Sequence, residues 1–137
     1  DRVGVEFRHS SWVQPEEIER TLAFLAAQDL TYVCVDAPRV AGTNVMPPLV
    51  AATSDVAYVR FHGRNAATWN ARVATAAERF RYLYDQEELR EWVEPITHLR
   101  EQTGTTYVMF NNCYGDYAPR NATQMLGLLG ETASASE

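Results

Sequence analysis

The stretch Ala57-Tyr58-Val59-Arg60-Phe61-His62 decides the fold, because apolar and polar side chains alternate along it. A period of two is typical of a β-strand whose two faces meet different surroundings. Three other stretches, residues 3–9, 32–36 and 106–111, alternate in the same way. The sequence therefore predicts four strands.

One face of the predicted strands is apolar and the other is charged. We assign to the apolar face Val3, Val5, Phe7, Val33, Val35, Val59, Phe61, Val108 and Phe110. We assign to the polar face Glu6, Arg8, Asp36, Arg60, His62 and Asn111. The polar residues gather towards the C-terminal ends of their strands, which is where α/β sheets build active sites. We therefore expect these polar side chains to share one rim.

Helical segments are expected between the strands. Apolar residues at helical spacing follow positions 15, 85 and 119, and a shorter helix fits residues 69–79. Asp85 and Glu88 form a capping-box pattern, and Pro95 predicts a kink or break in the helix that they begin. Gly130 is the expected C-cap of the last helix. Strands that alternate with helices predict an α/β fold with a parallel sheet.

Four such strands indicate half of a parallel (β/α)8 barrel of the TIM type. A complete barrel needs ~250 residues, whereas this chain has 137 and begins with Asp1 rather than Met. We expect residues 1–130 to be the C-terminal half of such a barrel and residues 131–137 to be a flexible tail. The partner that closes the barrel would be the missing N-terminal half or a second copy of the chain.

Composition excludes several classes of protein. The net charge of −6 argues against a broad nucleic-acid interface. All twelve basic residues are arginine, so Schiff-base lysine chemistry is excluded. Each of these side chains ends in a planar guanidinium group, which is suited to bind carboxylate or phosphate. No apolar run reaches the length of a membrane span and no signal peptide is visible. Two cysteines make no disulfide framework, so we expect a cytoplasmic protein.

Glu6, Asp36 and His62 are the candidate catalytic residues. Glu6 would be a general base or metal ligand, and Asp36 would share the cation. His62 would be a ligand or proton shuttle, because histidine exchanges protons near neutral pH. Oxygen and imidazole ligands together suit Mg, Mn or Zn. The alternative is an ion-paired interior, with Glu6 on Arg60, Asp36 on Arg8, and His62 as a hydrogen-bonded core histidine. The sequence leaves both interpretations open.

The loops after the last two predicted strands favour a small anionic ligand. Gly63 and Gly115 allow close backbone approach, and arginine binds phosphate at two points. TIM barrels often hold phosphate in these loops. The alternative is that these residues only stabilise loops and turns. The candidate binding residues are Arg8, His9, Arg60, Arg64, Asn65, Asn111, Asn112, Tyr114, Arg120 and Asn121.

Three blocks of the chain, residues 5–12, 58–65 and 110–122, closely resemble the YecE-like proteins, a domain-of-unknown-function family. The blocks occur in order along nearly the whole chain, as in the C-terminal half of that family. The resemblance implies a TIM-barrel fold. It implies no reaction, because fold does not determine function.

From these patterns we expect an enzyme that acts on a small anionic, phosphorylated or sugar-containing compound, with metal-assisted hydrolysis as the first reaction to test. The rival hypothesis is a binding module for an anionic metabolite or a nucleic-acid end, without chemistry. Replacement of Glu6 by Gln distinguishes the two, because only an enzyme has turnover to lose.

Overall fold

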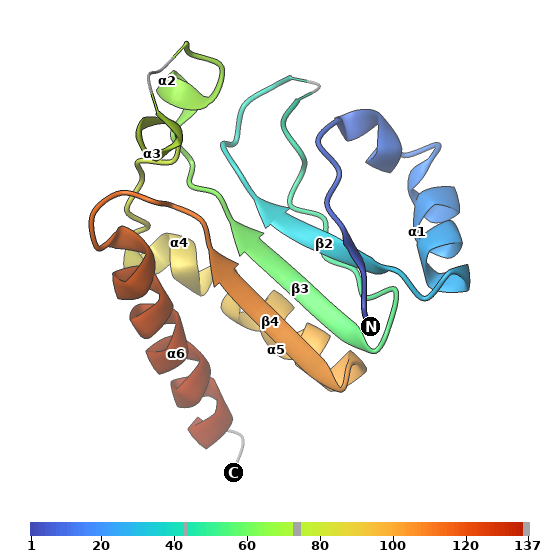
Figure 1. Ribbon diagram of the computed structural model, residues 1–137. Coiled ribbons are helices and arrows are strands. Elements are labelled where there is room, and N and C mark those ends of the chain that lie inside the picture. The colour runs from blue at the N-terminus through green and yellow to red at the C-terminus, as the bar shows by residue number, and fades with distance from the viewer. Residues whose placement is uncertain (43, 73–74, 136–137) are drawn as a thin grey trace.

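The computed structural model describes residues 1–42, 44–72 and 75–135 (Figure 1). Its centre is a four-stranded sheet in the order β1-β2-β3-β4, and each neighbouring pair is parallel. The strands are β1 (Gly4–Val5), β2 (Thr31–Asp36), β3 (Val56–Phe61) and β4 (Thr105–Phe110). The prediction of an α/β fold with four parallel strands is confirmed.

The described residues between β2 and β3 form no helix, whereas helices occupy the crossovers from β1 to β2 and from β3 to β4, and one helix follows β4. The helices are η1 (Ser10–Val13), α1 (Ile18–Ala27), α2 (Ala66–Trp69), α3 (Ala76–Arg79), α4 (Gln86–Arg90), α5 (Val93–Gln102) and α6 (Tyr117–Ala135). The Asp85–Glu88 capping box is present at the start of α4. The expected break precedes Pro95, which lies in the first turn of α5, where proline is tolerated.

Two predictions about the helices are wrong. Residues 69–79 do not form one helix, since α2 ends at Trp69 and α3 begins at Ala76; residues 73–74 lie outside the described part of the chain. The last helix runs through Gly130 to Ala135, so Gly130 is not its C-cap. Glycine inside a helix is only modestly unfavourable, and it does not end a helix by itself. Of the expected tail, residues 136–137 lie outside the described residues.

The hydrophobic core lies between the sheet and the helices that cover β3 and β4 on one side (Figure 1). Phe61 is fully buried there and stacks on Phe110 with ring centroids 4.6 Å apart. Tyr84 and Trp92 meet Phe61 edge-on, each at 5.4 Å. Such aromatic pairs add to the burial of apolar area that stabilises the sheet against its helices.

The opposite face of β3 and β4 is only partly covered. Side chains along β4 alternate between intermediate and exposed, and Tyr107 and Met109 remain about half exposed. Tyr58 and Tyr107 lie side by side on this face, with ring centroids 5.8 Å apart. We call this surface the open face of the sheet.

The register corrects the assignment of β2 to its faces. Val33 pairs with Tyr58 and Val35 with Arg60, so both valines share the open face. Asp36 pairs with Phe61 and therefore lies on the helix-covered face. All six residues of β2 are buried. A strand buried on both faces loses the contrast between apolar and polar positions, and its pattern cannot show which face is which.

Within the described residues, no helix combines the length and the apolar character that crossing a lipid bilayer requires.

Candidate functional site

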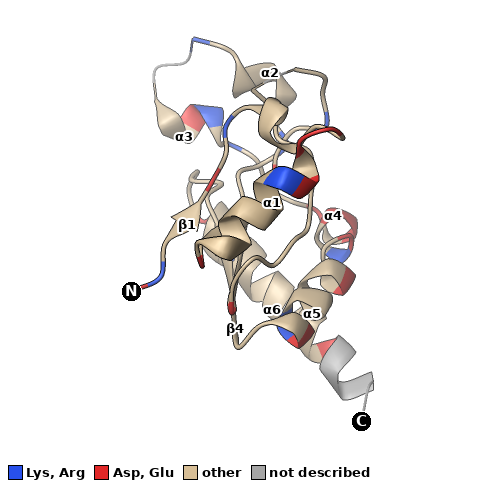
Figure 2. Cartoon of the chain, turned by 90° about the vertical axis from the view of Figure 1, so that its right-hand side faces the viewer, with Lys and Arg blue, Asp and Glu red and all other residues tan. Residues whose placement is uncertain are grey.

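Five of the six predicted rim residues meet at the C-terminal edge of the open face. The carboxylate of Glu6 accepts from Arg60 Nη1 at 3.0 Å and lies 3.1 Å from His62 Nε2. Arg8 Nη2 approaches the other carboxylate oxygen at 2.6 Å. Asn111 Nδ2 lies 3.0 Å from His62 Nδ1. We call these five residues the Glu6 cluster, and Figure 2 shows acidic and basic residues close together on the segment after β1.

The backbone explains why these side chains meet. Arg60 is the last residue but one of β3 and lies on the open face, and His62 follows Phe61 on the same side. The His62 amide donates to the Asp36 carbonyl, and the Asn111 amide donates to the Phe61 carbonyl. Parallel pairing therefore continues one residue beyond each strand and brings His62 and Asn111 to adjacent positions.

The surroundings of Glu6 make it a charge-bearing group rather than a general base. Burial alone would raise the pKa of Glu6. The hydrogen bond and the charge of His62, followed by the positive charges of Arg8 and Arg60, outweigh burial and hold that pKa below its ordinary value of 4.5. A carboxylate with three donors and a lowered pKa is a weak base, so Glu6 does not suit the role of general base.

His62 is enclosed by the protein. Its side chain is 1% exposed, and the rings of Trp69 and Phe80 lie 6.4 and 5.8 Å from its own ring. The cavity beside it, which Glu6 and Trp69 also line, has a volume of about 10 Å³. This volume admits at most one water molecule.

Asp36 belongs to a different cluster, on the helix-covered face. It is fully buried and accepts from Arg64 at 2.8 and 3.0 Å and from Arg39 at 2.9 Å. Tyr84 Oη and Trp92 Nε1 also donate to it, at 2.6 and 2.8 Å. The expected pair of Asp36 with Arg8 is therefore wrong, whereas the pair of Glu6 with Arg60 is confirmed.

The Asp36 cluster is a structural centre. Five hydrogen bonds satisfy both carboxylate oxygens, which a buried charge requires. Burial and the carboxylate raise the pKa of the Tyr84 hydroxyl above its ordinary range, so this hydroxyl stays a donor. The same hydroxyl accepts the amide proton of Gly63 at 2.8 Å. Asp36 thus joins β2 to the segment after β3 and to the helices.

The predicted metal centre is not formed. The described residues include no group of three or more His, Cys, Asp and Glu side chains placed to hold a metal ion. Glu6 and His62 lie together, but Asp36 is on the other face of the sheet and is occupied by arginine, tyrosine and tryptophan donors. Because β2 is buried on both faces, its sequence pattern could not predict that Asp36 lies apart from Glu6 and His62.

Asn65, Asn112 and Asn121 hold loops together. Asn121 accepts from the Tyr84 amide and donates to the Tyr84 carbonyl, both at 3.0 Å, and Asn112 donates to Asn121 at 2.9 Å. Asn65 donates to the Arg81 carbonyl at 3.0 Å. Asn112 and Asn121 are fully buried. These contacts match the alternative in which the asparagines stabilise loops.

The remaining candidates also have local partners. His9 accepts through Nδ1 from the Ser11 amide and caps η1. The Arg81 guanidinium lies over the Tyr114 ring at 4.2 Å. Arg120 faces Asp116 at 3.8 Å, one helical turn away. The candidate binding residues Arg60, Arg64 and Arg120 do not converge, because each of them pairs with a different carboxylate.

The charges of the two clusters differ in sign. Arg8 and Arg60 surround the single carboxylate of Glu6, which leaves one positive charge in excess when His62 is neutral. Around Asp36, the two arginines Arg39 and Arg64 face Asp36, Glu88 and Glu91, which leaves one negative charge in excess. An anion is therefore attracted to the Glu6 cluster and repelled from the other.

A groove of about 760 Å³ runs along the open face and reaches Glu6 and Arg60. Its floor includes Tyr58 and Tyr107, which our sequence analysis did not select. Their signal was present, because Tyr58 alternates with the buried Ala57 and Val59 along β3, and Tyr107 precedes the partly buried Val108 in β4. The groove is the approach to the Glu6 cluster from solvent.

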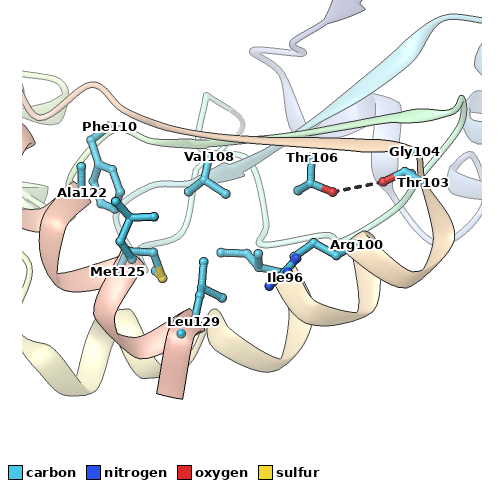
Figure 3. A pocket seen from close by; sticks show the side chains of 12 residues that line it. Ile96, Arg100, Thr103, Gly104, Thr106, Val108, Phe110, Ala122, Met125 and Leu129 are labelled. Atoms are coloured by element: carbon cyan, nitrogen blue, oxygen red, sulfur yellow. Dashed lines mark hydrogen bonds between the residues drawn. The ribbon is translucent and has the colours of Figure 1, made fainter. Parts of the chain in front are cut away.

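A second groove, of about 650 Å³, opens between β4, α5 and α6 (Figure 3). Val108 and Phe110 of β4, Ile96 of α5, and Met125 and Leu129 of α6 point into it. Among the described residues, the side chains that line this groove are mostly apolar, and none of them is suited to acid–base chemistry.

Comparison with known proteins gives the family. The sequence pattern of the family described as "Protein of unknown function DUF72" matches residues 1–137. The chain belongs to the DUF72 family. The UPF0759 protein YunF of Bacillus subtilis is 35% identical over 129 residues, which is 92% of this chain and 46% of YunF. The resemblance to YecE-like proteins is confirmed at the level of this DUF72 family.

Solved DUF72 structures share the fold. A DUF72 protein from Thermotoga maritima is 40% identical, with a TM-score of 0.82 over 95% of this chain and 46% of that one. A DUF72 protein from Enterococcus faecalis is 33% identical, with a TM-score of 0.85 over 94% of this chain and 47% of that one. The chain thus spans about half the length of these DUF72 relatives.

Proposed function

We propose that the Glu6 cluster binds a small anionic compound through Arg8 and Arg60, and that His62 transfers a proton in its hydrolysis. The observation that supports this most directly is the excess positive charge of the cluster in a chain of net charge −6. Arg8 is 64% exposed and Arg60 is 30% exposed, so both guanidinium groups are accessible to a ligand. Arginine binds phosphate and carboxylate groups with two parallel hydrogen bonds.

In this proposal each group has a separate role. Arg8 and Arg60 neutralise the charge of the substrate, and Glu6 holds the two guanidinium groups and His62 in place. His62 removes a proton from the attacking water and returns it to the leaving group, which is general acid–base catalysis. Tyr58 and Tyr107 provide flat faces along the groove for a sugar ring or another apolar part of the substrate.

We also propose that this chain is the C-terminal half of a TIM-type barrel, with the open face as part of its interior. Four parallel strands, an uncovered sheet face and relatives of about twice the length support this. Completion by an N-terminal half, or by a second copy, would enclose the groove and exclude water from it. Light scattering during gel filtration separates the two, because pairing of two copies gives twice the 15.5 kDa mass of the chain.

A specific observation favours the second candidate function, anion binding without chemistry. His62 is 1% exposed and its adjoining cavity is only about 10 Å³, so a substrate does not reach the ring in this conformation. Under this alternative the arginines bind the anion, and His62 only supports Glu6.

Thermal-shift measurements with phosphate, phosphorylated sugars and dicarboxylates test the anion site. Any compound that binds the folded chain raises its melting temperature. Arg60→Gln should abolish the shift. Arg20→Gln on α1 is the matched control, because the Arg20 side chain is 85% exposed and pairs with Glu17 rather than with Glu6. Absence of a shift with every anion would overturn the proposal.

The two candidate functions are separated by Glu6→Gln and His62→Gln in the presence of a compound that binds. An enzyme loses turnover in both variants, and His62→Gln keeps its affinity, because Glu6 still holds the two guanidinium groups in place. A binding module shows no turnover in the parent chain and the same affinity in His62→Gln.

A further inference from the structure

We propose that Asn111 is a positioning residue that keeps the His62 ring neutral, with its proton on Nε2 and a lone pair on Nδ1. The sequence suggested Asn111 as a contact for substrate, but the structure places it against the ring. The inference rests on the acid–base role proposed for His62. Its test requires no substrate, so the two can fail separately.

The two neighbours of His62 require the same tautomer. Asn111 Nδ2 lies 3.0 Å from Nδ1, and an amide nitrogen can only donate, so Nδ1 must be the acceptor. Glu6 Oε1 lies 3.1 Å from Nε2, and a carboxylate with lowered pKa can only accept, so Nε2 must carry the proton. The chain of hydrogen bonds therefore runs from Asn111 through His62 to Glu6.

Asn111 opposes the effect of the neighbouring carboxylate. A negative charge beside a histidine favours the doubly protonated ring. Such a ring has no lone pair, so it cannot accept a proton and would form only an ion pair with Glu6. A donor at Nδ1 stabilises the neutral ring alone, because the doubly protonated ring has a hydrogen at that position. The Asn111 amide thus favours the neutral form of the His62 ring.

Cys113 holds the amide of Asn111 in this orientation. A half-turn of the amide would bring Oδ1 to the ring and would suit the doubly protonated form. The Cys113 Sγ lies 3.1 Å from the Asn111 carbonyl oxygen and 3.4 Å from Oδ1, and it donates to these acceptors. After a half-turn the thiol would face a second donor instead. The Asn111 backbone is itself anchored by its amide, which donates to Phe61 at 2.7 Å.

The protonation state of the ring can be read directly from the nitrogen NMR signals of the 15N-labelled chain at neutral pH. The chain has three histidines, so His9→Gln and His98→Gln variants assign the His62 signals by elimination. We expect the parent chain to show a protonated Nε2 and an unprotonated Nδ1 for His62. A proton on Nδ1, alone or together with one on Nε2, would overturn the proposal.

Variants of the two supporting residues provide the matched comparison. Asn111→Asp replaces the donor by an acceptor, and we expect both ring nitrogens to become protonated. Cys113→Ala removes the thiol donor and should increase the doubly protonated fraction, whereas Cys113→Ser keeps a donor and should match the parent chain. If Asn111→Asp leaves the ring neutral, or if the alanine and serine variants behave alike, Asn111 and Cys113 do not have the roles assigned to them.

Failure of this inference and failure of the proposed function give different results. A neutral ring in a chain that binds no anion supports the inference and contradicts the proposed function. A doubly protonated ring in a chain that hydrolyses an anionic compound supports the function and contradicts the inference.

Discussion

Glu6 and Asp36 lie at the same end of the sheet but on opposite faces. Glu6 accepts from Arg60 on the open face, whereas Asp36 pairs with Phe61 and faces the helices. The two carboxylates therefore hold different sets of arginines and cannot share a cation. One is half-enclosed beside a groove, and the other is a buried structural group.

Asp36→Asn is expected to destabilise the chain by about 3–5 kcal/mol, because it leaves buried donors of Arg64 and Tyr84 without their charged acceptor. Asp116→Asn is the control, since its ion pair with Arg120 is exposed and should change the free energy of unfolding by less than about 1 kcal/mol. Urea denaturation of both variants measures the difference. Equal stability would show that Asp36 is not a structural centre.

Acid sensitivity should depend on Glu6. Its pKa is lowered in the folded chain, so its ionised form stabilises the fold above the ordinary value of 4.5. That contribution is lost as the pH falls below 4.5 and the carboxylate becomes protonated. In Glu6→Gln, unfolding free energies measured from pH 6 to pH 3 should fall less steeply than in the parent chain. Parallel curves would contradict this prediction.

Two glycine substitutions should act in opposite directions. Gly63 has φ of +90°, and a Cβ atom there would lie 2.8 Å from the Cβ of Tyr82, so Gly63→Ala should cost about 1–3 kcal/mol. Gly127 lies within α6, and a Cβ atom there would meet nothing within 4 Å. Gly127→Ala should therefore stabilise the chain by about 0.5–1 kcal/mol. Melting temperatures of the two variants must move to opposite sides of the parent value.

The two thiols should differ in reactivity. Burial raises the pKa of Cys34 to about 11, whereas Cys113 is exposed. Since the thiolate is the reactive form, a thiol reagent at pH 8 should modify only Cys113 in the folded chain. In denaturant both thiols should react. The Cys113→Ser variant is the control, because it should show no reactive thiol when folded and one, Cys34, when denatured. Rapid modification of Cys34 under native conditions would mean that this residue of β2 is not buried, which would contradict the prediction.

Alternation along three strands was sufficient to predict much of the Glu6 cluster. Glu6, Arg60, His62 and Asn111 were expected on one rim, and their contacts place them there. These residues follow strands with one covered and one open face, where a period of two reports burial directly. The same reasoning failed for Asp36, because its strand is buried on both faces.

The loop residues could not be assigned from sequence. Asn112 and Asn121 are nine residues apart, and both contact the segment around Tyr84, more than thirty residues away from Asn121. Asparagine has donors and an acceptor that serve a ligand or a backbone equally well. Whether an asparagine binds a ligand or the backbone depends on which groups the fold brings next to it, here the backbone groups of Tyr82 and Tyr84.

The sequence by itself determined four parallel strands, the three longer helices and the family, because periodicity, capping residues and chain order act locally. The tertiary structure alone decided that Asp36 leaves the rim, that Arg60 and Arg64 pair with different carboxylates, and that Asn111 faces His62. These depend on sheet register, which is set by pairing between residues about 25 to 50 positions apart. A shift of one residue in that register would turn every one of these side chains to the other face.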